Sequence, residues 1–491
     1  MCVLLGLLLG LLAQPALAHS FGSSYALPIP FAFYAWGAAL ALVVSFVILA
    51  VGAASSLKVT HPAEALITIP ADTPARRSLF GRALQAVSVL LLVLTIATGL
   101  FGSQDSFTNF SMTFFWIVFV LGVTYAVALL GDFYALANPW RALCDSVEAL
   151  WPGVFAGRIT GSSGWGDWPA LLLYIGFICV ELFAHSTPQF LAAALLVYTA
   201  INVLGAALVG KEAWFRHGEF FAVFLRWIGT MAPIARTTLA EGGRPVVRVR
   251  APFVGLLAAR VTHTSGVLFI LFMLASTVFD AIRETRPWVK AFWAGILPSV
   301  AHWLPAAEED RLAAANALYD AWQWLGLLAS PFLYFGVFAG FMWLTKSIAR
   351  SYLSTLELTR RFAPTLVPIA FVFHVTHYYT LLLSQGPQIG RLVSDPFGAG
   401  WDLFGTVATA MPTVMVDAGT IWHTQVAMIV IGHLASVYLA HCEALRTFSR
   451  PRDAIASQIP MLLLMMALTV FGLWILSLPL SAGPVGLPPS S

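Results

Sequence analysis

Two histidines, His374 and His377, stand near the middle of an apolar stretch, Phe371–Gln385, that has the character of a membrane-spanning helix. Three residues apart on a helix, their imidazoles share one face. Ionisable side chains at that depth are costly, and they usually mark a functional site. Because neutral imidazole and carboxylate ligands suit zinc, copper, iron or manganese, this pair indicates a site for a divalent transition metal.

Three further histidines extend this prediction. His433 lies near mid-depth of the apolar stretch Ile421–Ala440, and His423 lies near its start. His19 would become the first residue of the mature chain, where its amine and imidazole could chelate a metal together. We expect His374, His377 and His433 to act as ligands, with His423 and His19 belonging to a second, shallower site.

Two carboxylates are candidates for catalysis. Glu181 lies in the apolar stretch Pro169–His185 and shares a helical face with His185, so it could serve as a ligand or a base. The alternative for Glu181 is a hydrogen bond to a buried hydroxyl or to His185. Asp402 lies in the segment SDPFGAGWDLFGT, Ser394–Thr406, which is either a capped interfacial loop or a lid that turns Asp402 inward. Gly398, Gly400 and Gly405 allow tight turns there.

Other interpretations of the histidines stay open. A histidine on a membrane helix often only bonds a neighbouring helix, and the HxxH spacing is less specific than HExxH. His423 and His433 are ten residues apart, about 80° out of register on a helix, which disfavours a pair of stacked haems. The chain has no GxxxxGK[ST] motif, which argues against an ATP-driven pump, and no GxSxG serine-hydrolase motif.

The composition places the chain in a membrane. Of its 491 residues, 59% are hydrophobic and only 10% are charged, whereas soluble proteins carry roughly 25% charged residues. The mean hydropathy is +0.83. The predicted fold class is therefore all-α, a polytopic membrane helix bundle in contact with the lipid bilayer. A net charge of +3 does not suggest nucleic acid as a partner, and four cysteines without a CxxC motif favour neither disulfides nor thiolate metal sites.

Residues 1–18 resemble a secretory signal peptide, with an apolar core, Pro15 and the small-x-small site Ala16-Leu17-Ala18. The alternative is an uncleaved first helix. Residues 19–491 then form a single integral membrane helical domain with about ten transmembrane helices. These are expected at Phe31–Ala54, Ala83–Phe101, Phe110–Gly131, Pro169–His185, Pro188–Gly210, His263–Ile282, Gln323–Thr345, Leu366–Gln385, Ile421–Ala440 and Pro460–Leu480. Two apolar segments interrupted by charge, Glu219–Pro233 and Pro287–Pro305, are expected to be interfacial or re-entrant.

The distribution of positive charge predicts the orientation. With the mature N-terminus outside, all but five of the 26 Lys and Arg residues fall in inward segments. The exceptions are Arg283, Arg286, Lys290, Arg311 and Arg391. This bias follows the positive-inside rule and agrees with an N-terminal signal peptide. It places Glu181, His374, His377 and His433 between the membrane middle and the outer face, with Asp280 at the outer end of its helix.

Five segments together resemble a family of bacterial integral membrane proteins labelled fenitrothion hydrolase. They are HSFGSSYALPIP, WPALLLYIGFICVELF, LVPIAFVFHVTHYYTLLLSQG, SDPFGAGWDLFGT and GHLASVYLAH, and they span His19 to about Cys442. The family often has an acidic residue where this chain has Ala26. The resemblance implies location in the bacterial inner membrane and hydrolysis of an organophosphate triester with release of a nitrophenol.

This chemistry would suit the predicted site. A phosphotriester is neutral and needs no charged clamp, and a metal can polarise its phosphoryl oxygen and activate water. Glu181 or Asp402 would take the proton, and a small lipophilic substrate would enter from the bilayer. Two other functions stay open: a transporter or metal-handling protein without hydrolytic chemistry, and a membrane subunit of a redox complex that requires a partner subunit.

Overall fold

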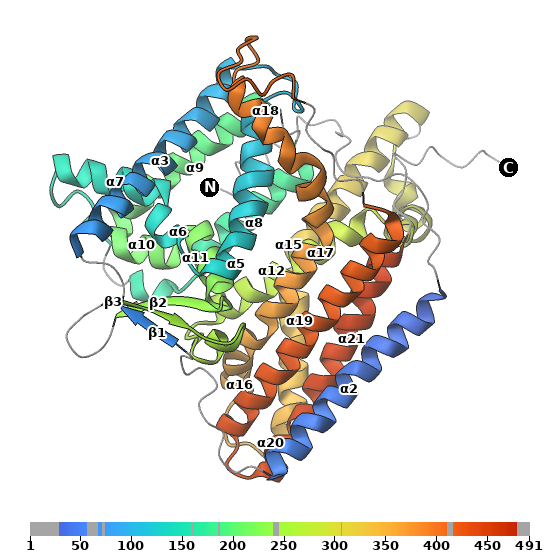
Figure 1. The fold of residues 1–491 in the computed structure, drawn as a ribbon. Helices are drawn as coiled ribbons and strands as arrows, with labels where there is room; N and C mark the ends of the chain where they lie inside the picture. Colours follow the sequence, from blue (N-terminus) through green and yellow to red (C-terminus); the bar gives the residue numbers. More distant parts are fainter. Residues whose placement is uncertain are drawn as a thin grey trace. The chain divides into compact units, whose positions relative to one another are not determined.

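The computed structural model describes residues 29–55, 67–70, 74–159, 162–184, 187–238, 245–305, 307–409 and 416–478. Helices make up most of these residues, which confirms the predicted all-α class. Nine of the described helices are long and apolar enough to cross a bilayer (Figure 1). The chain is therefore a multi-pass membrane protein. The predicted signal peptide, residues 1–18, and His19 lie outside the described residues.

One of the about ten expected spans, Pro169–His185, is too short in the structure to cross a bilayer. It forms helix α8, Trp168–Phe183, of 16 residues. Such a helix is about 24 Å long, which is less than the roughly 30 Å of a hydrocarbon core. It begins where Pro169 occupies the first turn behind Asp167, and it ends where Ala184 is extended. Among the described residues, the corrected count is nine long helices and two shorter apolar helices, α8 and Phe220–Thr230.

The chain divides into two compact units. The first holds Lys58–Gly266 and Tyr378–Val416, and the second holds Ala16–Leu57, Val267–His377 and Asp417–Ser491. Helix α17, Val367–Gln385, contributes to both, because the division falls between His377 and Tyr378.

The first unit combines long helices with short ones and a small sheet. Strand β3 lies between β1 and β2, and both pairings are antiparallel. The elements are β1 Ile67–Pro70, α3 Pro74–Phe101, α4 Phe110–Met112, η1 Thr113–Val123, α5 Thr124–Leu130, α6 Tyr134–Ala137, α7 Pro139–Leu150, η2 Ser162–Trp165, α8, α9 Pro188–Val209, α10 Lys211–His217, α11 Phe220–Thr230, β2 Ile234–Thr238, β3 Pro245–Val249, η3 Val254–Leu257, η7 Gly386–Gln388 and α18 Ile389–Ser394.

The segment Glu219–Pro233 forms the half-length helix α11. Helix α10 turns back along α9, so that the Trp214 indole N–H donates to the Asn202 side chain at 2.8 Å. The chain then reaches the middle of α9, where Tyr198 donates to Glu219, before α11 begins. The segment is thus a short apolar helix beside α9, and its interfacial or re-entrant placement stays a prediction.

The second unit is built from long helices. Its elements are α2 Phe31–Ser55, α12 Thr264–Arg283, α13 Arg286–Lys290, η4 Ala291–Ile296, α14 Leu297–Val300, η5 Ala301–Trp303, α15 Glu308–Ile348, α16 Thr355–Phe362, η6 Ala363–Leu366, α17 up to His377, α19 Ala418–Thr447, α20 Pro451–Ala456 and α21 Gln458–Ser477. The segment Pro287–Pro305 is thus helical without a break from Arg286 to Trp303, with a π-helical part at Ala291–Ile296. Helices α2, α19 and α21 pack side by side (Figure 1).

Glycines let α17 approach its neighbours closely. A methyl group added at Gly432 of α19 would collide with the Val372 side chain, and one added at Gly472 of α21 would lie 2.8 Å from the Phe373 ring. Membrane helices pack through such small residues because lipid offers no hydrophobic driving force between helices. These contacts hold the helix that carries His374 and His377 against α19 and α21.

Candidate functional site

A buried carboxylate pairs with one of the two central histidines in the second unit. The His377 Nε2 atom lies 2.9 Å from the Asp280 Oδ2 atom. Asp280 is only 7% exposed. A carboxylate at this depth fixes the orientation and tautomer of an imidazole and stabilises its protonated form. The pair joins α12 to α17 and forms the centre of the candidate site.

Arg283 completes this constellation. Its Nε atom lies 3.3 Å from the other Asp280 oxygen, and its Nη2 atom lies 3.0 Å from Glu284. A third guanidinium nitrogen, Nη1, approaches the Gln323 side chain of α15 at 3.5 Å. The site therefore combines an acid–base pair with a largely buried cation.

The local structure explains how Arg283 and Asp280 come together. They are three residues apart in the last turn of α12, so they share a face. A cation is favourable at a helix C-terminus and a carboxylate is unfavourable there. Asp280 therefore needs Arg283 and His377 as partners. The sequence places Asp280 at a helix end but does not identify it as a site residue. The signal that could have found the pair is an i, i+3 Asp–Arg pair closing an apolar helix.

The remaining histidines differ in their surroundings. His433 is 1% exposed, and its Nδ1 atom lies 2.8 Å from the Ile429 carbonyl oxygen, so Nδ1 donates and Nε2 keeps its lone pair. His423 is exposed, with Nδ1 2.7 Å from the Gly419 carbonyl and Nε2 3.2 Å from the Tyr34 hydroxyl. Both ring nitrogens of His423 are thus engaged, and this side chain fits a bond between α2 and α19 better than a shallow metal site.

The described residues do not fit a complete metal site. Among them, no three His, Cys, Asp or Glu side chains gather as a metal ion requires. His374 and His377 share a face of α17, but structural and catalytic metal sites usually need at least three protein ligands. The predicted ligand His19 lies outside the described residues.

Glu181, the predicted catalytic carboxylate, lies in the first unit. Its Oε1 atom accepts a hydrogen bond of 3.2 Å from the Tyr378 hydroxyl. Tyr378 packs against Ile117 and Leu121, which belong to the 11-residue π-helix η1. π-Helical turns are rare and often occur at functional sites. The bond to a buried hydroxyl is the alternative that the sequence left open for Glu181.

The loop that carries Asp402 is held by hydrogen bonds between its own residues. Asp395 accepts from the backbone of Ala399 and Gly400 at 2.9 and 2.8 Å, and Asp402 accepts from the backbone of Val407 at 3.1 Å. Three glycines in this loop have positive φ, which confirms the predicted tight turns: Gly398, Gly400 and Gly405. Asp402 is exposed, and the hydrogen bond that its carboxylate accepts comes from the backbone of the same loop.

A second buried carboxylate, Glu219, was not identified as a site residue from the sequence. It is fully buried and accepts from Asn138 at 3.0 Å, from Tyr198, and from the backbone N–H groups of Phe221 and Ala222 at 3.0 and 2.7 Å. Glu219 is the N-cap of α11, and Asn138 is the N-cap of α7. The sequence feature that could have identified Glu219 is an acidic residue directly before an apolar run.

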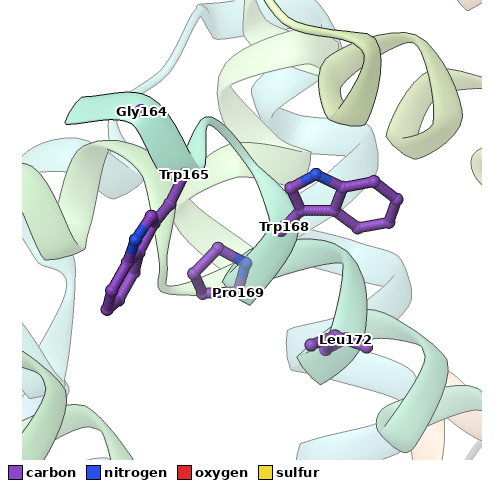
Figure 2. A pocket seen from close by; sticks show the side chains of 5 residues that line it. All are labelled: Gly164, Trp165, Trp168, Pro169 and Leu172. Atoms are coloured by element: carbon purple, nitrogen blue, oxygen red, sulfur yellow. The ribbon is translucent and has the colours of Figure 1, made fainter. Parts of the chain in front are cut away.

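A shallow pocket lies at the start of α8. Its lining is formed by Gly164, Trp165, Trp168, Pro169 and Leu172, and the two indole rings splay apart (Figure 2). None of these residues carries an ionisable group. Partly exposed tryptophans of this kind suit the membrane–water interface.

Neither a protein-family model, nor a curated protein, nor a solved structure matches this chain. The functional argument therefore depends on the side-chain contacts within each of the two units.

Proposed function

We propose that the chain is a membrane-bound hydrolase of neutral, lipophilic organophosphate triesters, with a nitrophenol as the leaving group. The observation that supports this proposal is the 2.9 Å contact between His377 and Asp280. A histidine oriented by a carboxylate is the usual form of a general base at near-neutral pH. The substrate class comes from the family resemblance, and its neutrality and lipophilicity suit a site on membrane helices.

The reaction would use the chain's own acid–base groups. His377 takes a proton from water as the water oxygen bonds to phosphorus, and Asp280 stabilises the imidazolium that forms. The Arg283 guanidinium stabilises negative charge on the phosphoryl or thiophosphoryl group. The bond from phosphorus to the aryl oxygen breaks, and the proton on His377 passes to the departing aryl oxide. The products are a phosphodiester and a nitrophenol.

A divalent transition metal stays part of the proposal as an additional component. When bound, it would polarise the phosphoryl group and activate water. His374 and His377 would hold it with further ligands that the described residues do not bring to the same place, and a base other than His377 would then take the proton from water. Elemental analysis of the purified chain tests this part separately from the acid–base mechanism.

The direct test is release of the nitrophenol from fenitrothion by the purified full-length protein, followed by absorbance. We expect His377→Gln and Asp280→Asn to abolish release, and the matched exposed variant His423→Gln to retain it. Equal rates in His377→Gln and in the unchanged protein would contradict the proposal. Loss of activity on chelation, with restoration by one metal, would add the metal to the mechanism.

We also propose the bacterial inner membrane as the location, with the mature N-terminus outside. The charge bias of the sequence supports this orientation. Labelling of single cysteines placed at Asp310 and Arg450 with an impermeant reagent in intact cells tests it. The Asp310 position should react and the Arg450 position should not.

The main alternative is a transporter without hydrolytic chemistry. The observation that favours it is the interrupted pair of short helices α10 and α11, whose junction brings Glu219 to Tyr198 in the middle of α9. Transporters often build their substrate and ion sites from interrupted helices. Uptake of intact fenitrothion into proteoliposomes without nitrophenol release would favour this function. A Soret band would instead indicate a redox subunit, whose assembly with a partner subunit could then be tested.

A further inference from the structure

Helix α19 carries a stripe of polar side chains along most of its length. At about 100° per residue, its members fall within about 80° of one another, and the stripe is about 33 Å long. That length matches the roughly 30 Å of a hydrocarbon core. The members are Gln425, His433, Ser436, Glu443 and Thr447. A polar stripe facing the protein interior is uncommon on a spanning helix and points to a path for water or ions.

Three atoms of this stripe are buried and have no hydrogen-bond partner among the described residues. They are His433 Nε2, Ser436 Oγ and Thr447 Oγ1. An unsatisfied buried polar atom costs about 1–3 kcal/mol, and ordered water usually satisfies such atoms. Three of them on one face of one helix therefore indicate a column of water molecules along α19.

His433 is suited to pass protons in such a column. Its Nδ1–H is held by the Ile429 carbonyl, so the Nε2 lone pair is the proton-accepting atom. The side chain is 1% exposed, and Ser436, one turn further on, is fully buried. A hydroxyl both donates and accepts, so Ser436 can relay a proton between His433 and the next water. At the Thr447 end, Glu443 lies 4.0 Å from Arg446.

Helix α17, which carries His374 and His377, lies beside α19. The Gln425 side chain donates to the Thr376 carbonyl at 2.9 Å, and Gly432 packs against Val372. These two contacts make α17 and α19 antiparallel neighbours. His374 lies between them along α17, and His377 follows one turn later with Asp280. At about 100° per residue, His374 and His377 lie about 140–160° around α17 from Val372, so water must bridge them to the stripe on α19.

Other ionisable groups near α19 lie off this stripe. His423 and His441 fall on the opposite side of the helix, and His441 is bonded to Gln458 at 2.9 Å. Besides α17, the elements packed against α19 are α2, α16, α20, α21 and η6. Their ionisable side chains are Tyr34, Glu357, Arg360, Arg361, Arg452 and Asp453.

We propose that α19 and α17 form a proton path across the membrane, in which the directly bonded pair Asp280–His377 is linked through water molecules to His374, His433, Ser436 and Glu443. Each step moves a proton from one oxygen or nitrogen to the next, and no other bond changes. Proton conduction is a further activity of the chain, and it requires neither hydrolysis nor a metal.

The test uses the full-length protein in liposomes that enclose the pH-sensitive dye pyranine. A potassium gradient with valinomycin drives protons across the membrane. We expect flux well above that of protein-free vesicles for the unchanged protein. His433→Gln, which retains polarity but cannot be protonated near neutral pH, should reduce the flux to the protein-free level. His423→Gln and His441→Gln are matched controls on the same helix and should conduct normally.

Ser436→Ala removes one hydroxyl with little change in volume and should reduce the flux even if His433→Gln does not fold. Conduction equal to that of protein-free vesicles in the unchanged protein would overturn the proposal. Normal conduction in correctly folded His433→Gln or Ser436→Ala would also overturn it. Nitrophenol release measured on the same preparations separates this result from the proposed hydrolase activity.

Discussion

Asp280→Asn is the most informative single substitution for the candidate site. It keeps the shape of the side chain but removes the charge that lies between His377 and Arg283. Breaking a buried ion pair by removing one partner costs about 3–5 kcal/mol. The Asn carbonyl can keep one of the two hydrogen bonds, and Arg283 retains Glu284 at 3.0 Å. We therefore expect a loss of about 2–3 kcal/mol in the free energy of unfolding.

The measurement is unfolding of the purified protein in mild detergent by added SDS, followed by circular dichroism. A matched control is Asp310→Asn, an exposed residue in the first turn of α15, which should cost no more than about 0.3–1 kcal/mol. Combining Asp280→Asn with Arg283→Gln gives a double-mutant cycle, with an expected coupling of about 1–3 kcal/mol. If Asp280→Asn costs no more than the control, or the coupling is zero, the assignment of Asp280 as a buried paired anion is wrong.

Three other substitutions test the surrounding structure in the same unfolding assay. Glu219→Ala should cost about 3–5 kcal/mol because it leaves Asn138, Tyr198 and two backbone donors buried without an acceptor; a loss below 1 kcal/mol would contradict this. Gly432→Ala should cost about 1–3 kcal/mol by overpacking against Val372, and Val372→Ala in the same chain should recover part of the loss. Tyr34→Phe should cost only about 0.5–1 kcal/mol because its bond to His423 is exposed, so a large effect would show that this bond matters more than its exposure suggests.

Local features of the sequence predict much of this fold. Mean apolarity over about 20 residues identifies the spanning helices, because a bilayer imposes that length on every one of them. The same rule overestimates α8, because the apolar stretch between Asp167 and His185 has only 17 residues and the helix ends at Phe183. Hydropathy reports how favourably a segment enters lipid, and it does not report at which residue the helix ends.

The partners of the polar residues are harder to predict. His374 and His377 are recognisable as unusual from their own helix, but the carboxylate that meets His377 comes from a residue 97 positions away. His423 has the same residue type, yet a backbone carbonyl and Tyr34 occupy its two nitrogens. Which helices face each other is decided by packing contacts such as Gly432 on Val372, and a single sequence without an alignment does not report those contacts.

The two buried carboxylates, Glu219 and Asp280, have different surroundings, and this difference distinguishes a structural role from a chemical one. Glu219 receives four hydrogen bonds, two from the N-terminal backbone of the helix it caps, so helix and carboxylate stabilise each other. Asp280 sits at a helix C-terminus, where the dipole opposes its charge, and it depends on two ionisable partners. A buried ion pair is often no more stable than an apolar replacement of the same volume. Stability alone therefore explains Glu219 but not Asp280, and the acid–base role proposed for Asp280 with His377 supplies the reason for keeping it.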